Sequence, residues 1–197
     1  MTRPKGAIAG AMRRGVLLAA TALQVSLVTS AHAARVERFD QAVNDALRTL
    51  YTNVAGARAL RDKAKAVLVF PRVVKTGAAS GKRGGPGALR EHGIATGYYR
   101  SLGDFRGVEP GVESFGYVLF FMSTAALDVL RKTDGWQIGA GPNVVVIDEG
   151  MARTLSTAGA QGDICAIVFN PKGLMTGVDL RDTRVTPFRP KGDLRLP

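Results

Sequence analysis

Histidine and cysteine, the residues that most often carry nucleophilic or metal-binding chemistry, are scarce in this chain. There are two histidines, His32 and His92, and one cysteine, Cys165. No zinc-binding spacing can be built from them. Cys165 lies in the apolar run Ile164–Phe169, which is typical of a buried strand, so we expect a packed core thiol. His92 precedes a glycine and is expected in a turn. The sequence thus predicts no metal site and no cofactor.

Serine and carboxylate chemistry is not indicated either. The segment Gly111–Gly116 reads G-x-x-S-x-G, whereas a nucleophile elbow needs a glycine two residues to either side of the serine. Asp148, Glu149 and Asp163 are expected where strands end, as solvated turn carboxylates, and their spacing is not that of an EF-hand. We therefore predict that the protein is not an enzyme and has no catalytic residues.

The glycine-rich segment Gly77–Gly87 is the remaining candidate for phosphate chemistry. Its first part lacks one residue of the Walker spacing, and Arg83 stands where the magnesium-binding hydroxyl would be, which argues against an ATP site. Exposed backbone N–H groups beside Lys82 and Arg83 would still suit a phosphate oxygen. The segment is equally explained as a loop or bend that glycine permits between strands. Both interpretations stay open.

Basic residues are concentrated around this segment. Eight of them lie between residues 58 and 83, where Asp62 is the only acidic residue. They are Arg58, Arg61, Lys63, Lys65, Arg72, Lys75, Lys82 and Arg83. Each basic side chain close to an anionic membrane contributes about 1 kcal/mol to binding. If these side chains converge, the cluster forms a surface for anionic head groups; otherwise it is an ordinary solvated face.

The first 33 residues have the pattern of a secretory signal peptide. Four basic residues and no acidic residue precede the apolar run Gly15–Thr29, and Ala31 and Ala33 occupy the small-residue positions of a cleavage site. The run is shorter and more polar than a membrane-spanning helix of roughly 20 residues. We predict cleavage after Ala33, by either the general or the twin-arginine route. The protein would then be exported, and periplasmic or peripheral to the cell-envelope membrane.

The charge of the remaining 164 residues, a length that fits one domain, points to an anionic partner. Without the predicted signal the chain keeps 23 basic and 16 acidic residues, a net charge of +7. An exported protein rarely meets nucleic acid, so anionic membrane lipids are the expected partner, with an envelope protein or acidic polymer as the alternative. We expect residues 34–186 to form the domain. Residues 187–197 are expected as a tail rich in proline and basic residues, with mobility from Arg184 onwards.

Helices are expected first and short strands after them. Apolar residues at spacings of three and four predict a helix over Phe39–Val54, and a second helix is expected over Ala57–Ala64. A third, Ala125–Lys132, is expected among the strands, capped by Ser123 or Thr124. The expected strands are Ala66–Phe70, Arg72–Thr76, Ala88–Arg90, Ile94–Arg100, Gly116–Met122, Trp136–Gly139, Asn143–Asp148, Met151–Ser156, Ile164–Phe169 and Leu174–Leu180.

Turn residues separate these strands, which favours antiparallel pairing over repeated βαβ units. Glu91–Gly93 suits a hairpin turn, and Asn170–Gly173 is a second strong turn. The predicted class is α+β, with N-terminal helices packed on a mainly antiparallel, curved or barrel-like sheet that has one inserted helix.

A series of motifs runs through the predicted domain in a recognisable order. It opens with Lys63–Gly77, whose centre reads Ala66-Val-Leu-Val-Phe-Pro71. The later motifs are Gly84–Leu89, Thr96–Ser101, Tyr117–Met122 with Ala126-Leu127, Gly135–Gly139, Asn143–Asp148 and Phe169–Met175. Their order and spacing, over roughly residues 39–186, resemble the SYLF domain, also called the DUF500 family.

The resemblance implies a non-catalytic lipid-binding module, because relatives bind phosphoinositides through an amphipathic N-terminal helix and nearby basic residues. Carried over to this chain, the membrane helix would present the apolar stripe Phe39, Val43, Leu47 and Leu50. The head-group contacts would be Lys63, Lys65, Arg72 and Lys75, to which the glycine segment adds Lys82 and Arg83. That segment is more basic here than in the family, and phosphoinositides are not expected outside a bacterial cell. General binding of anionic phospholipid is therefore the prediction.

A structural or protein-interaction module of the periplasm without lipid affinity is the alternative. The two functions make different demands on the N-terminal stripe. Membrane binding by the helix requires part of the stripe to be exposed or releasable. A structural role requires it to be buried on the sheet.

Overall fold

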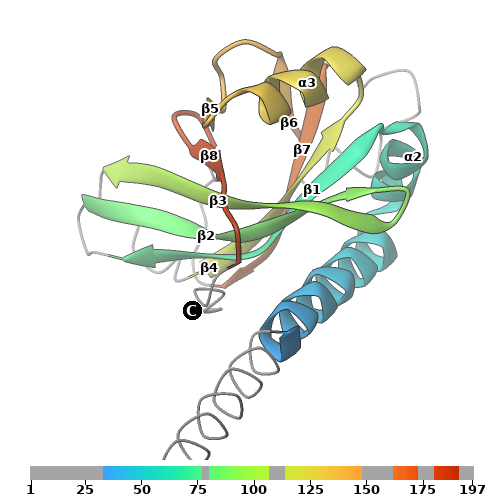
Figure 1. The fold of residues 1–197 in the computed structure, drawn as a ribbon, viewed down its shortest axis with the longest axis horizontal. Helices are drawn as coiled ribbons and strands as arrows, with labels where there is room; N and C mark the ends of the chain where they lie inside the picture. The colour runs from blue at the N-terminus through green and yellow to red at the C-terminus, as the bar shows by residue number, and fades with distance from the viewer. Residues whose placement is uncertain (1–32, 77–79, 107–113, 148–161, 173–179, 191–197) are drawn as a thin grey trace, which may run out of the picture.

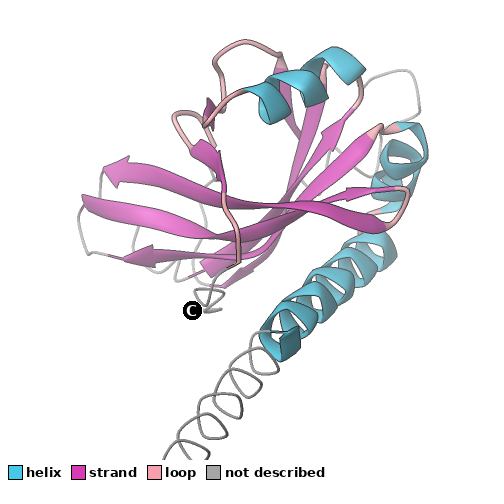
Figure 2. Cartoon of the chain, viewed as in Figure 1, coloured by secondary structure: helices cyan, strands magenta, loops and turns pink. Residues whose placement is uncertain are grey.

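The computed structural model describes residues 33–76, 80–106, 114–147, 162–172 and 180–190. Its class is α+β, as the sequence predicts: helices at the N-terminus are followed by a strongly curled, half-barrel sheet of eight strands with one inserted helix. Figures 1 and 2 show this arrangement, with the N-terminal helix and α3 on different sides of the sheet. Among the described helices, none is both long and apolar enough to cross a membrane.

The elements follow one another along the chain with short connections. Residues 33–53 are helical, and the helix α2 (Ala55–Lys63) follows at once. The remaining elements are β1 (Ala66–Thr76), β2 (Ser80–Glu91), β3 (Ile94–Arg106), β4 (Ser114–Phe121), α3 (Thr124–Lys132), β5 (Trp136–Gln137), β6 (Val144–Ile147), β7 (Ile164–Lys172) and β8 (Arg184–Pro187). The strand order in the sheet is β5-β8-β3-β2-β1-β4-β7-β6.

Most neighbours in the sheet are antiparallel, and the pairing of β6 with β7 is parallel. The two-residue turn between β2 and β3 consists of His92 and Gly93, with φ of 50° and 84°. Positive φ at both turn residues matches the right-handed twist of the strands and gives a tight hairpin. The predicted hairpin turn is confirmed. The predicted cap is also confirmed, because the N–H of Ala126 donates to Ser123 Oγ at 3.2 Å.

The central strands are buried on both faces, so the sheet separates two hydrophobic clusters. Leu68 and Phe70 of β1 point to the face that carries α3, and the alternating residues Val67 and Val69 point to the face covered by the N-terminal helix and α2. This explains why β1 is read in the sequence as a continuous apolar run rather than an alternating one. Phe70 stacks on Tyr117 of β4, with ring centroids 4.6 Å apart.

The prediction of a loop over Gly77–Gly87 is wrong from residue 80 onwards, because Ser80–Glu91 is a strand that pairs with both β1 and β3. The glycines are needed for close packing rather than for a loop. A Cβ at Gly85 would lie 2.2 Å from the carbonyl oxygen of Arg72, and one at Gly87 would lie 2.5 Å from the ring of Phe70. The missing side chains let β1 and its phenylalanine approach β2.

Two predictions near the C-terminus are also corrected. A turn was expected at Asn170–Gly173, but the strand β7 continues through Asn170 to Lys172. The φ of 49° at Asn170 marks a local irregularity in this strand. The segment Arg184–Pro187 is the strand β8, paired with β3, rather than part of a mobile tail. Phe188 continues this contact, since its N–H donates to the carbonyl of Tyr98 at 3.0 Å. The predicted signal sequence to residue 32, the predicted strand Met151–Ser156 and most of Leu174–Leu180 lie outside the described residues.

Candidate functional site

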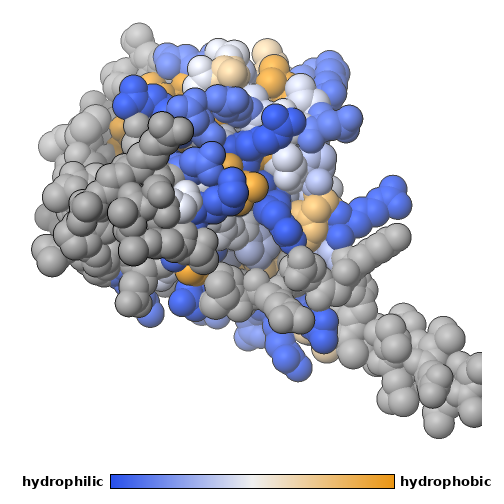
Figure 3. All heavy atoms as spheres, turned by 90° about the vertical axis from the view of Figure 1, so that its left-hand side faces the viewer, coloured by the Kyte–Doolittle hydropathy of each residue, from blue (hydrophilic) through white to orange (hydrophobic). Residues whose placement is uncertain are grey.

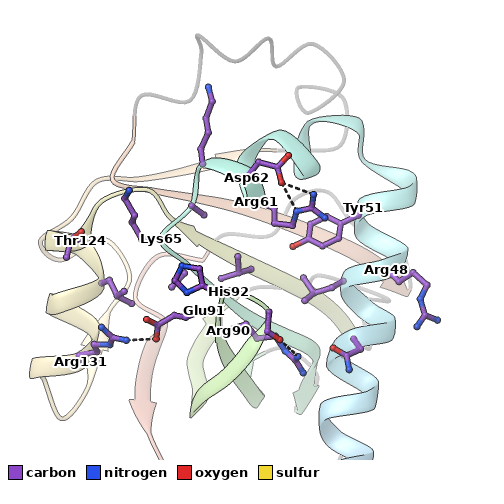
Figure 4. Close-up of a pocket in the computed structure, with 18 residues that line it drawn as sticks. Arg48, Tyr51, Arg61, Asp62, Lys65, Arg90, Glu91, His92, Thr124 and Arg131 are labelled. Atoms are coloured by element: carbon purple, nitrogen blue, oxygen red, sulfur yellow. Dashed lines mark hydrogen bonds and ion pairs between the residues drawn. The ribbon is translucent and has the colours of Figure 1, made fainter.

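A groove of about 930 Å³ lies where the β2–β3 hairpin meets the start of β1. Its walls come from the N-terminal helix, the α2–β1 connection, the hairpin and α3. Figure 4 shows Thr124 and Arg131 of α3 on one side of the groove, Tyr51 of the N-terminal helix on the other, and His92 between them. The groove therefore joins segments that are far apart in the sequence.

Basic residues dominate the lining of the groove. They are Arg48, Arg61, Lys63, Lys65, Arg90 and Arg131, against the two acidic residues Asp62 and Glu91. Arg48 points away from the groove in Figure 4 and pairs with Asp45 at 3.2 Å. Even without Arg48, cations outnumber carboxylates, so the groove carries positive charge.

One wall is organised around Tyr51. The guanidinium of Arg61 lies over the Tyr51 ring, 5.2 Å from its centroid, and also donates to Asp62 at 2.7 Å. The backbone carbonyl of Tyr51 accepts from Arg58 Nε at 2.8 Å. Burial raises the pKa of Tyr51 to about 12, so its hydroxyl stays protonated at physiological pH. This wall thus presents the Arg61–Asp62 ion pair and the protonated hydroxyl of Tyr51.

The opposite wall is held by an ion pair between the hairpin and α3. Glu91 pairs with Arg131, and it also accepts a hydrogen bond from the hydroxyl of Thr96 at 2.6 Å. The bond from Thr96, followed by Arg131, lowers the pKa of the Glu91 carboxyl below its ordinary value. Glu91 therefore ties α3 to the hairpin while it is ionised.

The substitution Glu91→Gln is expected to reduce the pH dependence of stability in acid. Since the pKa of Glu91 is lowered by folding, its contribution is fully present above the ordinary glutamate pKa of about 4.3 and is lost as the pH falls through the lowered value. Urea unfolding from pH 7 to pH 3 should show a gap between native protein and variant that closes in acid. The exposed Glu37→Gln serves as control, and a gap independent of pH would contradict this role.

The floor of the groove is anchored to the N-terminal helix through Arg90. Its guanidinium donates to the carbonyls of Gly93 at 3.0 Å and Asp40 at 3.3 Å, and it lies 3.8 Å from the Asp40 carboxylate. The hydroxyl of Tyr98 donates to the other carboxylate oxygen of Asp40 at 2.9 Å. Asp40 lies within the helix predicted over Phe39–Val54, and no local pattern shows that its carboxylate meets Arg90 and Tyr98.

The basic residues selected from the sequence do not form one surface. Lys63 and Lys65 line the groove, whereas Arg72, Lys75, Lys82 and Arg83 lie at the other end of β1 and β2. At about 3.3 Å of rise per residue, Arg72 lies about 23 Å and Lys75 about 33 Å along the chain from Lys65. Lys82 forms an ion pair with Asp104 at 2.9 Å. Sequence reasoning missed Arg90 and Arg131, which reach the groove from β2 and α3.

The predicted membrane-facing stripe belongs to the hydrophobic core instead. Phe39, Val43 and Leu50 are buried against the sheet, and Leu47 is half-buried at the edge of the groove. A helix face that covers the sheet cannot at the same time face lipid. Membrane binding by this helix requires part of the stripe to be exposed or releasable, whereas a structural role requires it to be buried on the sheet. The burial seen in the structure is the arrangement that the structural role requires.

The predicted positions of Cys165 and His92 agree with the structure. Cys165 is fully buried in β7, and burial raises the pKa of its thiol. His92 is exposed in the hairpin turn. Within the described ranges, no three or more His, Cys, Asp or Glu side chains gather in an arrangement that could hold a metal ion.

Most of the described residues that are visible in Figure 3 are hydrophilic, and apolar side chains are scattered among them. The most exposed large apolar side chain of the described residues is Ile94, at 69%. It follows Gly93 of the hairpin turn, and Gly93 lines the groove.

Comparison with known proteins adds no assignment, since no family model and no curated protein matches the chain.

Proposed function

We propose that this protein is a non-catalytic peripheral lipid-binding module, and that its groove receives the head group of an anionic phospholipid. The observation that carries the proposal is the basic lining of the groove, a space of about 930 Å³ that is lined by Arg61, Lys63 and Lys65 among others. A cleft walled by one sign of charge concentrates ligands of the opposite sign. The groove is large enough for a head group rather than for a single ion.

The exposed Ile94 favours a membrane surface over a free phosphate compound. It lies at the tip of the hairpin directly beside the groove, so the same approach that brings a head group to the cations brings this side chain to the acyl boundary. Apolar burial combined with attraction to anionic lipids is the usual basis of peripheral binding. The expected export of the protein would place it beside envelope membranes, where such lipids occur.

Co-sedimentation with vesicles tests the proposal. We expect binding to vesicles that contain phosphatidylglycerol, weaker binding as salt rises from 0.05 to 0.5 M, and little binding to purely phosphatidylcholine vesicles, because salt screens the attraction between exposed charges. Electrostatic binding of an anionic head group requires that binding depend both on the charge of the lipid and on the salt concentration. Equal binding to the two vesicle types, or none to either, would refute it.

Replacement of the hairpin isoleucine, Ile94→Ser, is expected to weaken binding to anionic vesicles about fivefold without loss of stability. Fully burying an isoleucine side chain is worth about 1.5–3 kcal/mol, and shallow insertion recovers only part of that. The matched control is Val146→Ser, at a position that is 43% exposed and belongs to the edge strand β6. If Ile94→Ser binds as tightly as Val146→Ser, the hairpin does not enter the membrane.

A structural or protein-interaction role is the second candidate, and the burial of Phe39, Val43 and Leu50 is the observation that favours it. In that case the groove would receive an acidic segment of an envelope protein. Vesicle binding that is absent at every lipid composition would shift the preference to this role.

A further inference from the structure

The imidazole of His92 lies within the basic groove. Figure 4 shows its ring between the side formed by α3 and the side formed by the N-terminal helix, and His92 is part of the groove lining. The residue is exposed, so a ligand that enters the groove can reach it. Histidine is the side chain whose charge ordinarily changes between pH 5 and pH 8. Within that range, the charge of the groove can change at this position.

The hairpin holds His92 beside the groove through contacts on both sides of the residue. The φ angles of 50° at His92 and 84° at Gly93 belong to the tight turn between β2 and β3. After His92, the carbonyl of Gly93 accepts a hydrogen bond from Arg90 at 3.0 Å. Before His92, Glu91 pairs with Arg131 of α3. Because both neighbours of His92 are anchored, the turn is held at the groove.

Charged and titratable groups surround the imidazole on every element that forms the groove. Both carboxylates among them are already paired, Asp62 with Arg61 at 2.7 Å and Glu91 with Arg131. A protonated His92 therefore adds positive charge where cations already outnumber carboxylates, which disfavours the proton while the groove is empty. The groups are Arg90 and Glu91 of the hairpin, Arg131 of α3, Arg61, Asp62 and Lys63 of α2, Lys65 before β1, and Arg48 and Tyr51 of the N-terminal helix.

A bound anionic head group reverses this balance. The phosphodiester of a phospholipid carries a negative charge, and an opposite charge within about 6 Å favours the protonated form of an imidazole. Since coupling between two bound species is reciprocal, protonation of His92 must then favour the head group by the same factor. Side-chain carboxylates, lysines and arginines keep their charges between pH 5.5 and pH 8 and do not contribute to this effect.

We infer that His92 makes head-group binding in the groove dependent on pH, with tighter binding of anionic phospholipid in mildly acidic conditions. The inference rests on the function proposed for the groove, and it adds the residue that regulates that binding. The protonated imidazole supplies one more cation close to the head group. An additional cation of this kind is expected to raise the affinity about fivefold between pH 8 and pH 5.5.

An NMR titration of the full chain with dihexanoylphosphatidylglycerol tests the inference. The lipid is kept below its micellar concentration, and the titration is done at pH 8.0 and pH 5.5 with equal ionic strength. Its phosphodiester stays singly charged over this range, so a change in affinity comes from the protein. We expect saturable shifts of the imidazole C–H resonances of His92 and a dissociation constant about fivefold lower at pH 5.5.

Two substitutions of His92 separate its charge from its place in the turn. His92→Asn removes the titrating group but tolerates the positive φ of the turn, and it should bind at both pH values as the native protein does at pH 8. His92→Lys keeps a cation at both pH values and should bind at both as the native protein does at pH 5.5. The matched control is His32→Gln, which removes the other histidine and should keep the fivefold difference.

The outcomes distinguish failure of this inference from failure of the proposed function. Equal affinity of the native protein at the two pH values would overturn the role of His92 and leave the groove as the head-group site. A fivefold difference that persists in His92→Asn would do the same. Absence of saturable binding at both pH values would overturn the groove as the head-group site, and the role of His92 with it.

Discussion

The triple variant Arg61→Gln, Lys63→Gln, Lys65→Gln is expected to bind anionic vesicles on the order of 10²-fold more weakly than the native protein. Each cation near an anionic surface contributes about 1 kcal/mol, so three of them account for about 3 kcal/mol of binding free energy. All three side chains line the groove. The substitutions keep the side chains long and polar, and the ion pair of Arg61 with Asp62 is exposed, so little stability should be lost.

The matched control removes the same charge from the other end of the sheet. Arg72→Gln, Lys75→Gln, Lys82→Gln also lowers the net charge by three, but these residues lie along β1 and β2 away from the groove. We expect this control to weaken vesicle binding less than fivefold, as a general reduction in charge would. Equal losses in the two triple variants would mean that net charge alone drives adsorption and that the groove is not the site.

The substitution Gly85→Ala is expected to destabilise the fold by at least about 3 kcal/mol, which is large for the addition of one methyl group. The new Cβ would lie 2.2 Å from the carbonyl oxygen of Arg72 and 3.3 Å from the Cα of Val73. Both neighbours are backbone atoms of β1, so relief requires that two central strands separate. A side-chain rotation cannot relieve the contact.

Gly97→Ala in β3 is the control for this prediction. Its nearest contact would be the ring of Tyr99 at 3.2 Å, a side chain that can shift by the small distance required. We expect a cost below about 1 kcal/mol, since the substitution also reduces the conformational freedom of the unfolded chain. Urea unfolding followed by circular dichroism measures both free energies. Similar values for the two variants would show that the β1–β2 contact is not tightly packed at Gly85.

Several local features of the fold followed from the sequence because each depends on a few neighbouring residues. The apolar spacing from Phe39 to Val54 predicts a helix with one buried face, and the run Ala66–Phe70 predicts a strand buried on both sides. Glycine after His92 permits the positive φ that the hairpin turn requires, and a serine hydroxyl at position 123 caps α3. These are outcomes of backbone geometry and hydrogen bonding within one turn or strand.

Long-range packing decided what the local patterns left open. Gly84–Gly87 has the composition of a loop, yet it is part of a strand because Phe70 and the backbone of Arg72 occupy the space that side chains would need. The basic cluster reads as continuous in the sequence, but an extended strand places its two halves at opposite ends of the sheet. The groove itself joins a helix, a hairpin and α3 through pairs such as Arg90 with Asp40 and Arg131 with Glu91. Residues that are 40 or 50 positions apart meet only after the sheet has curled, so no local pattern in the sequence could reveal their contact.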